Sequence, residues 1–332
     1  KPDNRLFTYS KEHYAAAVVE RDTAGAAPFY SGLSGVADPV EKIVAIHDLR
    51  RFFKNPVRYY LEKKLLMKLP EAPSVDDQEP FTIDGLDAYR IKQELIDSHE
   101  EDVAQKIYRI RRAEGSLPFG AAGEFYFQKQ REKTDELLRT YAPCLRGKKI
   151  DPLEVDVEIG GYRLDGTIDD IAEEYHLHFR PAALKGGDYL AIWIDHLILN
   201  HLRPLGYPRR SVLIGEDKAF AFGAIEDAEK RLNDLIELFA RGNFRPLKLF
   251  ARTSFVYAEG LYKQKEPEEA LTDAKKEWLG DGYYTKAEAD AIENIICFGG
   301  ALPLDDEFRD CAQRTFGTIL ENIEKLVLPE VS

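Results

Sequence analysis

The chain has 332 residues, of which 44% are hydrophobic and 11% aromatic, so it can bury one large core or two moderate ones and is not a disordered polymer. Its formal net charge of -13 excludes a protein that coats nucleic acid through its overall field, and confines any contact with DNA or RNA to local basic patches. The three cysteines, Cys144, Cys297 and Cys311, lack zinc-site and disulfide-framework spacing, which indicates a reducing, cytoplasmic setting. No run of 18 apolar residues predicts a membrane span.

The first 45 residues are punctuated by Gly, Ala, Ser and Pro, which predicts a loop-like connector with one helical patch over 11–20. The chain starts at Lys1 and its only methionine is Met67, so we expect it to be a piece of a longer protein. The connector would then join it to a preceding region.

Helical periodicity begins at residue 46. The stretch 46–69 predicts a pair of helices broken at Asn55, because Pro56 suits the first turn of a second helix. An acidic, Pro-containing loop follows over 71–84. Apolar residues at helical spacing then predict one or two helices over 86–112 and another over 121–141.

The middle of the chain changes to a period of two. Apolar and charged residues alternate over 153–159, the Gly160-Gly161 pair predicts a tight hairpin, and strands over 162–171 and 175–179 would complete three antiparallel strands.

An amphipathic helix over 188–202 and two short strands over 211–215 and 218–222 are expected next. The rest is predicted to be mostly helical, with a strand or extended loop over 247–257. The expected fold is α+β, with an α/β-type sheet core over 150–223 between helical parts over 46–145 and 224–330.

One pair of motifs looks like half of a two-metal nuclease site. A metal-dependent phosphodiesterase needs two or more carboxylates that converge on Mg²⁺ and a nearby lysine that neutralises charge on phosphorus. The run GTID ends at Asp169, which supplies a first acid at a strand end. The run HFR then offers His178 where a second acid belongs and Arg180 where the lysine belongs.

The order of elements and four motifs carry a resemblance to a known family. The motifs are DLRRFFKNPVRYYL at 48–61, EPFTIDGL at 79–86, LPFGAAGE at 117–124 and WIDHL at 193–197. They resemble the C-terminal region of the gamma subunits of exodeoxyribonuclease V, the RecC family, from about residue 46 to the end. The resemblance implies a degenerate PD-(D/E)XK, restriction-endonuclease-like core with additional helices.

The resemblance also implies that catalysis has been lost. Active relatives place a His where this chain has Glu124 and a Gln where it has Ala191, and iron-sulfur relatives place a Cys at the position of Asn55. With His178 and Arg180, these substitutions leave only Asp169 of the metal-binding set, so we expect no catalytic residue and no metal. One alternative is a non-standard site rebuilt with Asp165, Asp170 or Glu124.

The family works inside a RecBCD-type helicase and nuclease complex in double-strand break repair and recombination. The resemblance therefore implies RecB-like and RecD-like partners, which use ATP and Mg²⁺, and forked double-stranded and single-stranded DNA. This fragment would hold no cofactor and would not be an enzyme by itself. It would help to split the duplex and to guide the strands, and a preceding helicase-like region would hold most of the scanning channel for the regulatory Chi sequence.

A basic, aromatic-rich stretch is the best candidate for DNA contact. Cations that pair with phosphates, interleaved with aromatic rings, are typical of single-strand binding. The candidate residues are Arg50, Arg51, Lys54, Arg58, Lys63 and Lys64. The competing interpretation is a solvated helix face whose aromatic rings point into the core. A second, shorter cluster comprises Lys106, Arg109, Arg111 and Arg112.

Other interpretations remain open from the sequence. His176 and His178 share one face of a strand and, with Asp169, could form a transition-metal site, although ordinary packing explains them better. A residual metal-dependent nuclease with relocated ligands, or a platform that docks only onto protein partners, would also fit the chain.

Overall fold

The computed structural model describes residues 42–70, 82–97, 101–142, 147–281 and 287–326. It has a mixed α+β architecture with two small sheets, and this confirms the α+β part of the expected fold class. The helical patch expected over 11–20, most of the acidic loop and Cys144 lie outside the described residues. In the part of the chain that is described, no helix is both long and apolar enough to cross a membrane.

The helical pair forms as expected. Helix α2 (Ile46–Lys54) buries one apolar face, and Asn55 ends it in an extended conformation. Helix α3 (Pro56–Tyr59) starts with Pro56, and the Asn55 side chain accepts a hydrogen bond from the Arg58 N–H at 3.0 Å. A π-turn over Tyr60–Lys64 continues α3. A cap and a proline therefore set the angle between the two helices.

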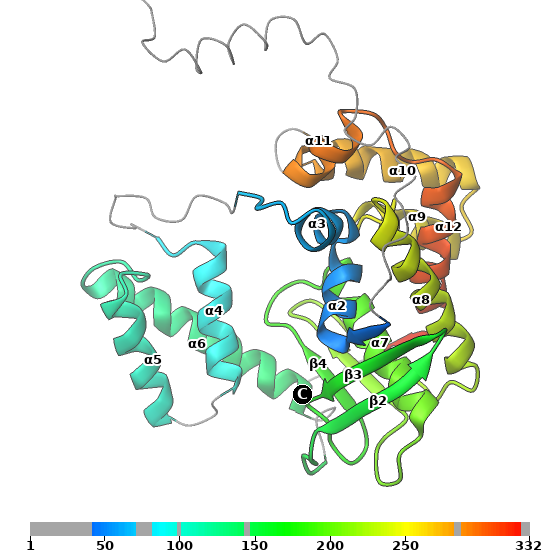
Figure 1. The fold of residues 1–332 in the computed structure, drawn as a ribbon. Coiled ribbons are helices and arrows are strands. Elements are labelled where there is room, and N and C mark those ends of the chain that lie inside the picture. Colours follow the sequence, from blue (N-terminus) through cyan, green and yellow to red (C-terminus); the bar gives the residue numbers. More distant parts are fainter. Residues whose placement is uncertain (1–41, 71–81, 98–100, 143–146, 282–286, 327–332) are drawn as a thin grey trace, which may run out of the picture.

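Three helices form a group of their own at the left of Figure 1. They are α4 (Gly85–Asp97), α5 (Glu101–Ala113) and α6 (Ala121–Tyr141), and the last matches the predicted span. They share a small core that includes Ile91, Ile107 and Phe127. The far end of α6 joins this group to the body, because Leu137 and Tyr141 pack with residues of the second sheet.

The first sheet has the strand order β1-β3-β2. Strands β2 (Leu153–Ile159) and β3 (Tyr162–Ile168) form the predicted hairpin, in which Gly160 and Gly161 both adopt positive φ. Strand β1 (Ile43–Ala45) pairs in parallel with β3 and was not predicted.

The prediction of three consecutive antiparallel strands was wrong. Strand β4 (His176–Phe179) belongs to the second sheet, whose order is β4-β5-β6-β7, and it pairs in parallel with β5 (Ser211–Ile214). Helix α7 (Gly186–Leu202) makes the crossover that a parallel pair requires. Strand β3 ends at Ile168, and the left-handed conformation of Asp170 (φ 54°) redirects the chain.

The second sheet is completed by strands distant in sequence. Strand β6 (Ala219–Phe222) follows β5 as predicted, and β7 (Ile323–Lys325) pairs with β6 near the end of the described residues. The strand or loop expected over 247–257 is partly helical, because α9 (Thr253–Tyr262) begins there. The other helices are α8 (Ala228–Phe244), α10 (Pro267–Leu279), α11 (Ile292–Phe298), α12 (Asp306–Ala312) and α13 (Thr318–Glu321).

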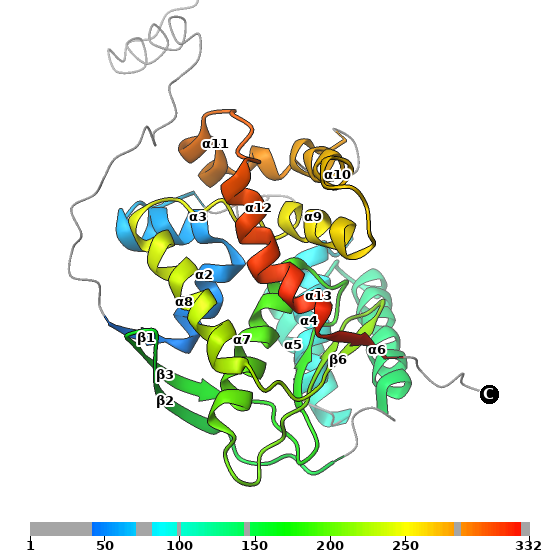
Figure 2. The same cartoon turned by 90° about the vertical axis from the view of Figure 1, so that its right-hand side faces the viewer.

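Helix α7 is the centre of the main core, with α2 and α8 beside it (Figure 2). It is apolar almost all round and contains the fully buried Trp193, Ile194 and Leu197. A second core joins the α3 turn to α9, α10, α11 and α12 through Val57, Phe250 and Phe308. The amino-terminal end of α7 therefore lies at a fixed place beside α2 and β4, where the largest group of predicted site residues meets.

Candidate functional site

A cavity of about 530 Å³ opens between α2, α4, β4 and the start of α7. We call it the basic cleft. Helix α2 supplies four of its residues, β4 and the residue after it supply His178 and Arg180, and α7 supplies Asp188 and Ala191. Its lining comprises His47, Arg50, Arg51, Lys54, Tyr89, Gln93, Asp170, Leu177, His178, Phe179, Arg180, Gly187, Asp188 and Ala191. Four permanent cations thus face two carboxylates, in a chain of net charge -13.

Arg50 is held from below by a buried acid. Its Nε and Nη2 lie 2.7 and 2.6 Å from Oδ1 of Asp195, which is 5% exposed, and Nη2 also donates to the Thr167 carbonyl at 3.4 Å. Burial raises the pKa of Asp195 to about 6, although the charge and hydrogen bond of Arg50 oppose the rise. The pair fixes one cation in the wall of the cleft.

Arg180 is fixed in a similar way at the other wall. It donates to Oδ1 of Asp188 at 3.1 Å and to the Ala183 carbonyl at 3.0 Å, and its guanidinium lies 5.3 Å from the centre of the Tyr89 ring. Asp188 also accepts the Lys185 N–H at 2.7 Å. Burial would raise the pKa of Asp188, but the nearby His178, the hydrogen bond from the Lys185 N–H and the charge of Arg180 lower it overall.

A buried polar chain runs inward from Asp195. His176 Nε2 lies 3.7 Å from Asp195 Oδ2, and the His176 ring is 3.5 Å from the Ser211 hydroxyl. His196 Nδ1 lies 2.9 Å from the same hydroxyl. Burial lowers the pKa of His176 to about 3 and that of His196 to about 4, so both rings are neutral at neutral pH.

The structure brings together only some of the predicted site residues. The vestigial positions His178, Arg180 and Ala191 share the basic cleft with the predicted DNA-binding residues Arg50, Arg51 and Lys54. Asp169 is exposed just after β3 and does not line the cleft, although its charge contributes to the raised pKa of Asp195. Glu124 lines a different cavity on α6, with Phe125, Gln128, Lys129 and Glu132.

The remaining basic residues of α3 and its π-turn lie outside the cleft. Arg58 pairs with Glu62 at 2.7 Å, and Lys63 lies 3.5 Å from Asp48. Lys64 is exposed and does not line the cleft. The aromatic rings of this stretch face inward: Phe52 and Tyr59 pack edge to face with Phe239 in the core. The competing interpretation therefore holds for the rings, whereas the cations of α2 do gather at one cavity.

The two histidines proposed as metal ligands face different surroundings. His176 is buried against Asp195, whereas His178 lines the cleft beside Asp188, 3.9 Å away. Among the residues that the structure describes, no three His, Cys, Asp or Glu side chains are grouped so as to hold a metal ion.

Sequence reasoning missed the acids that organise the cleft. Asp195 and Asp188 lie on α7, where Asp195 follows Trp193 and Ile194 in an almost wholly apolar helix. A charged residue in such a helix must be paired, so its position was a usable signal. Nothing in the sequence pointed to Arg50 as the partner, 145 residues away.

The fold and the cleft define an α+β domain whose carboxylates at the cleft are paired with basic side chains, Asp188 with Arg180 and Asp170 with Lys149. Its family is shown by comparison: residues 41–262 match the model of the RecC C-terminal domain, so the chain belongs to that family.

Curated relatives agree with this family. The RecBCD enzyme subunit RecC of Escherichia coli K12 is 27% identical over 223 residues, which cover 66% of this chain and 20% of that protein. The subunits of the same name from Mycolicibacterium smegmatis and from Buchnera aphidicola of Acyrthosiphon pisum are 28% and 24% identical, over 70% and 74% of this chain. The chain spans about a fifth of the length of these relatives.

Proposed function

We propose that this chain is a non-catalytic DNA-handling and assembly domain of a RecBCD-type helicase and nuclease complex, and that a DNA strand passes along its basic cleft. One observation carries the proposal: Arg50, Arg51, Lys54 and Arg180 line a single cavity in a strongly acidic chain. Phosphate groups are attracted to such a site and repelled by most of the remaining surface.

The cations of the cleft have two roles. Arg50 and Arg180 are held by Asp195 and Asp188, and because a guanidinium has five N–H donors, each keeps donors for a phosphate after its ion pair is made. Arg51 and Lys54 are exposed at the cleft, where Arg51 also pairs with Glu62 at 2.6 Å. Two cations held by the acids of α7 and two exposed cations suit guidance of a strand without capture at one position.

The absence of catalysis is part of the same proposal. We regard the sheet core as a degenerate PD-(D/E)XK fold in which His178 and Arg180 replace the second acid and the lysine. Support comes from the ion pairs, because Asp188 and Asp195 are committed to Arg180 and Arg50 and are not free to bind Mg²⁺. ATP and Mg²⁺ would be used by the partner subunits, in the cytoplasm, during double-strand break repair.

Assembly is supported by a different part of the chain. The group of helices α4, α5 and α6 leaves large apolar side chains in solvent: Phe119 is 80% exposed, Phe125 63% and Ile110 44%. Exposed aromatic residues of this kind are typical of protein interfaces. We propose these exposed side chains for contact with a RecB-like or RecD-like subunit, which keeps the docking interpretation beside the DNA interpretation.

The test compares charge reversal inside and outside the cleft. We expect the double variant Arg51→Glu, Lys54→Glu to bind a fluorescent single-stranded oligonucleotide at least about tenfold more weakly, with a shallower dependence on salt. The matched control reverses two exposed lysines on other surfaces, Lys230→Glu and Lys325→Glu. Equal losses in the two variants would contradict the cleft as the DNA site.

A second measurement tests catalysis. With Mg²⁺ or Mn²⁺, the purified chain should leave single-stranded and double-stranded DNA intact on a gel. Metal-dependent cleavage that disappears in Asp169→Ala would instead support the residual nuclease.

A further inference from the structure

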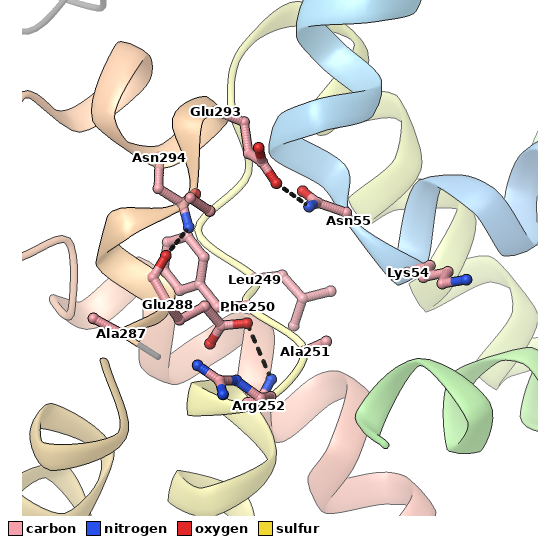
Figure 3. A pocket seen from close by; sticks show the side chains of 11 residues that line it. Lys54, Asn55, Leu249, Phe250, Ala251, Arg252, Ala287, Glu288, Glu293 and Asn294 are labelled. Atoms are coloured by element: carbon pink, nitrogen blue, oxygen red, sulfur yellow. Dashed lines mark hydrogen bonds between the residues drawn. The ribbon is translucent and has the colours of Figure 1, made fainter. Parts of the chain in front are cut away.

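A second cavity, of about 250 Å³, lies next to the basic cleft, and Lys54 lines both. We call it the α11 pocket. Helix α2 and its cap, the segment before α9, and the turn that enters α11 form its walls, as Figure 3 shows. Its polar and aromatic lining includes Lys54, Asn55, Phe250, Glu288, Glu293 and Asn294. The volume is slightly below the range of about 300 to 1,000 Å³ usual for ligand pockets, so it suits one small ring system.

Within the described residues, one buried acceptor of this pocket, Asn294 Oδ1, has no donor, and the buried carboxylate of Glu293 has a single neutral one. Glu293 is 6% exposed, and its one hydrogen bond in the described structure comes from the neutral Asn55 amide, at 2.6 Å. Asn294 is 5% exposed, its amide nitrogen donates to the Glu288 carbonyl at 2.7 Å, and its Oδ1 has no partner within the described residues. A buried acceptor without a donor is costly, so the pocket calls for a ligand that brings N–H groups.

The other carboxylate of the pocket differs in this respect. Glu288 accepts the Thr253 N–H at 2.9 Å and hydroxyl at 2.7 Å and the Arg252 N–H at 3.3 Å, all at the start of α9. Its hydrogen bonds stabilise that helix, so it does not depend on a ligand. The hydrogen-bond acceptors left for a ligand are therefore those of Glu293 and Asn294.

The charges of the lining select the class of ligand. A lysine or arginine side chain would bring N–H donors, but Lys54 and Arg252 already balance the two carboxylates of the lining, Glu288 and Glu293, so the pocket favours neutral donors. A nucleotide suits this lining, because its base carries neutral N–H donors and its phosphate is an anion. Lys54 also borders the basic cleft, so a strand whose phosphates lie in the cleft could place one base in the pocket.

We propose that the α11 pocket receives one unpaired nucleobase that carries an exocyclic amino group, with Glu293 and Asn294 as the acceptors and Lys54 at the adjoining phosphate. This inference rests on the proposed passage of DNA along the basic cleft. Among pyrimidines, cytosine offers an amino group where thymine offers a carbonyl oxygen. The pocket therefore distinguishes two bases of the same size.

The experiment uses fluorescence anisotropy with the whole chain and two eight-nucleotide strands, oligo-dC and oligo-dT, at one salt concentration. We expect oligo-dC to bind about tenfold more tightly, because the oligo-dT complex leaves a buried acceptor unpaired. In Glu293→Gln the new amide can donate to the thymine carbonyl, so the preference should shift toward oligo-dT. In Asn294→Leu the preference should shrink while oligo-dT affinity is kept.

The matched control is Asp290→Asn, which makes the same change of charge at an exposed position before α11, outside the pocket. It should keep the preference for oligo-dC. Circular dichroism and thermal unfolding of each variant separate loss of preference from loss of fold.

The outcomes separate the two proposals. If both strands bind equally and the variants change nothing, the base pocket is refuted while DNA handling stands. If neither strand binds, the proposed function fails and the base pocket with it. If an arginine-containing peptide binds in an Asn294-dependent manner and the two strands do not differ, the pocket serves a protein partner and the base assignment is overturned.

Discussion

Two arginine–aspartate pairs with almost equal distances lie in opposite surroundings. On the outer face of the β2–β3 hairpin, Arg163 donates to both oxygens of Asp156 at 2.6 Å, and the side chains are 52% and 61% exposed. Beneath the basic cleft, Arg50 lies 2.7 and 2.6 Å from Asp195, with side chains 26% and 7% exposed. From the distances alone, the two pairs would be expected to contribute equally to stability.

Burial separates them. Water solvates Asp156 whether or not Arg163 is present, so that pair contributes little to stability. Asp195 is buried, so loss of Arg50 leaves an unpaired charge away from solvent. By the same reasoning, the cations of the cleft are of two kinds: those whose loss destabilises the fold and those whose loss does not. Each variant below removes a group of one kind or the other.

Removal of Arg50 should have the largest effect. We expect Arg50→Ala to lower the free energy of unfolding by about 3 kcal/mol at pH 7, measured by urea denaturation, because Asp195 then remains buried without its cation. The loss should be smaller at pH 5, where Asp195, whose pKa is already raised to about 6, takes up a proton.

Arg163→Ala is the control for that variant, with the same deleted group and almost the same starting distances. It should leave the denaturation midpoint without measurable change at either pH. Similar losses in the two variants would show that burial does not decide the strength of these pairs.

The pH dependence of stability tests the buried groups together. The pKa values of His176 and His196 are lowered to about 3 and about 4, so the unfolded chain binds more protons and stability should rise as the pH increases from 4.5 to 6.5. The raised pKa of Asp195 acts in the opposite direction, since its contribution is lost as the pH rises through about 6.

Asp195→Asn isolates that opposing contribution. The gain in stability between pH 4.5 and 6.5 should be on the order of 2 kcal/mol larger in the variant than in the parent chain, since each unit of pKa shift corresponds to about 1.4 kcal/mol. Two parallel stability curves would mean that Asp195 does not titrate in this range.

How far the sequence predicted these features depended on whether the responsible contacts were local. The break at Asn55 and the Gly160-Gly161 hairpin were correct because caps and tight turns are set by neighbouring residues. The pairing of β4 was wrong because the partner strand comes after α7, and alternation of side chains does not specify a partner. The cations of α2 were predicted, whereas Asp195, which fixes Arg50, was not.

Asn55 makes a polar contact that involves no cation, and we expect its loss to have an effect on stability of intermediate size. Asn55 caps α3 through its oxygen and donates its amide to the buried Glu293. We expect Asn55→Ala to lower the free energy of unfolding by about 2 kcal/mol, because a cap is lost and a buried carboxylate loses its donor. Asp84→Ala removes an exposed cap of α4, where Asp84 accepts the Asp87 N–H at 2.7 Å, and should cost about 1 kcal/mol or less.

Thermal unfolding of both variants makes this comparison. If Asn55→Ala costs no more than Asp84→Ala, the bond between Asn55 and Glu293 adds nothing to the cap. Glu293 would then depend on Asn55 less than the structure indicates.

The smallest effect on stability should accompany a clear effect on DNA binding. Arg51 and Arg58 both pair with Glu62, at 2.6 and 2.7 Å, but only Arg51 lines the basic cleft. Because Glu62 keeps one arginine in either single variant, Arg51→Ala and Arg58→Ala should each change the free energy of unfolding by less than about 0.5 kcal/mol. Only Arg51→Ala should weaken binding of single-stranded DNA, about threefold, and reduce the slope of log affinity against log salt by about 0.7. Equal weakening by both would assign DNA contact to the whole basic stretch of α2 and α3 and not to the cleft, and would remove the distinction between cations that the fold requires and cations that a strand can use.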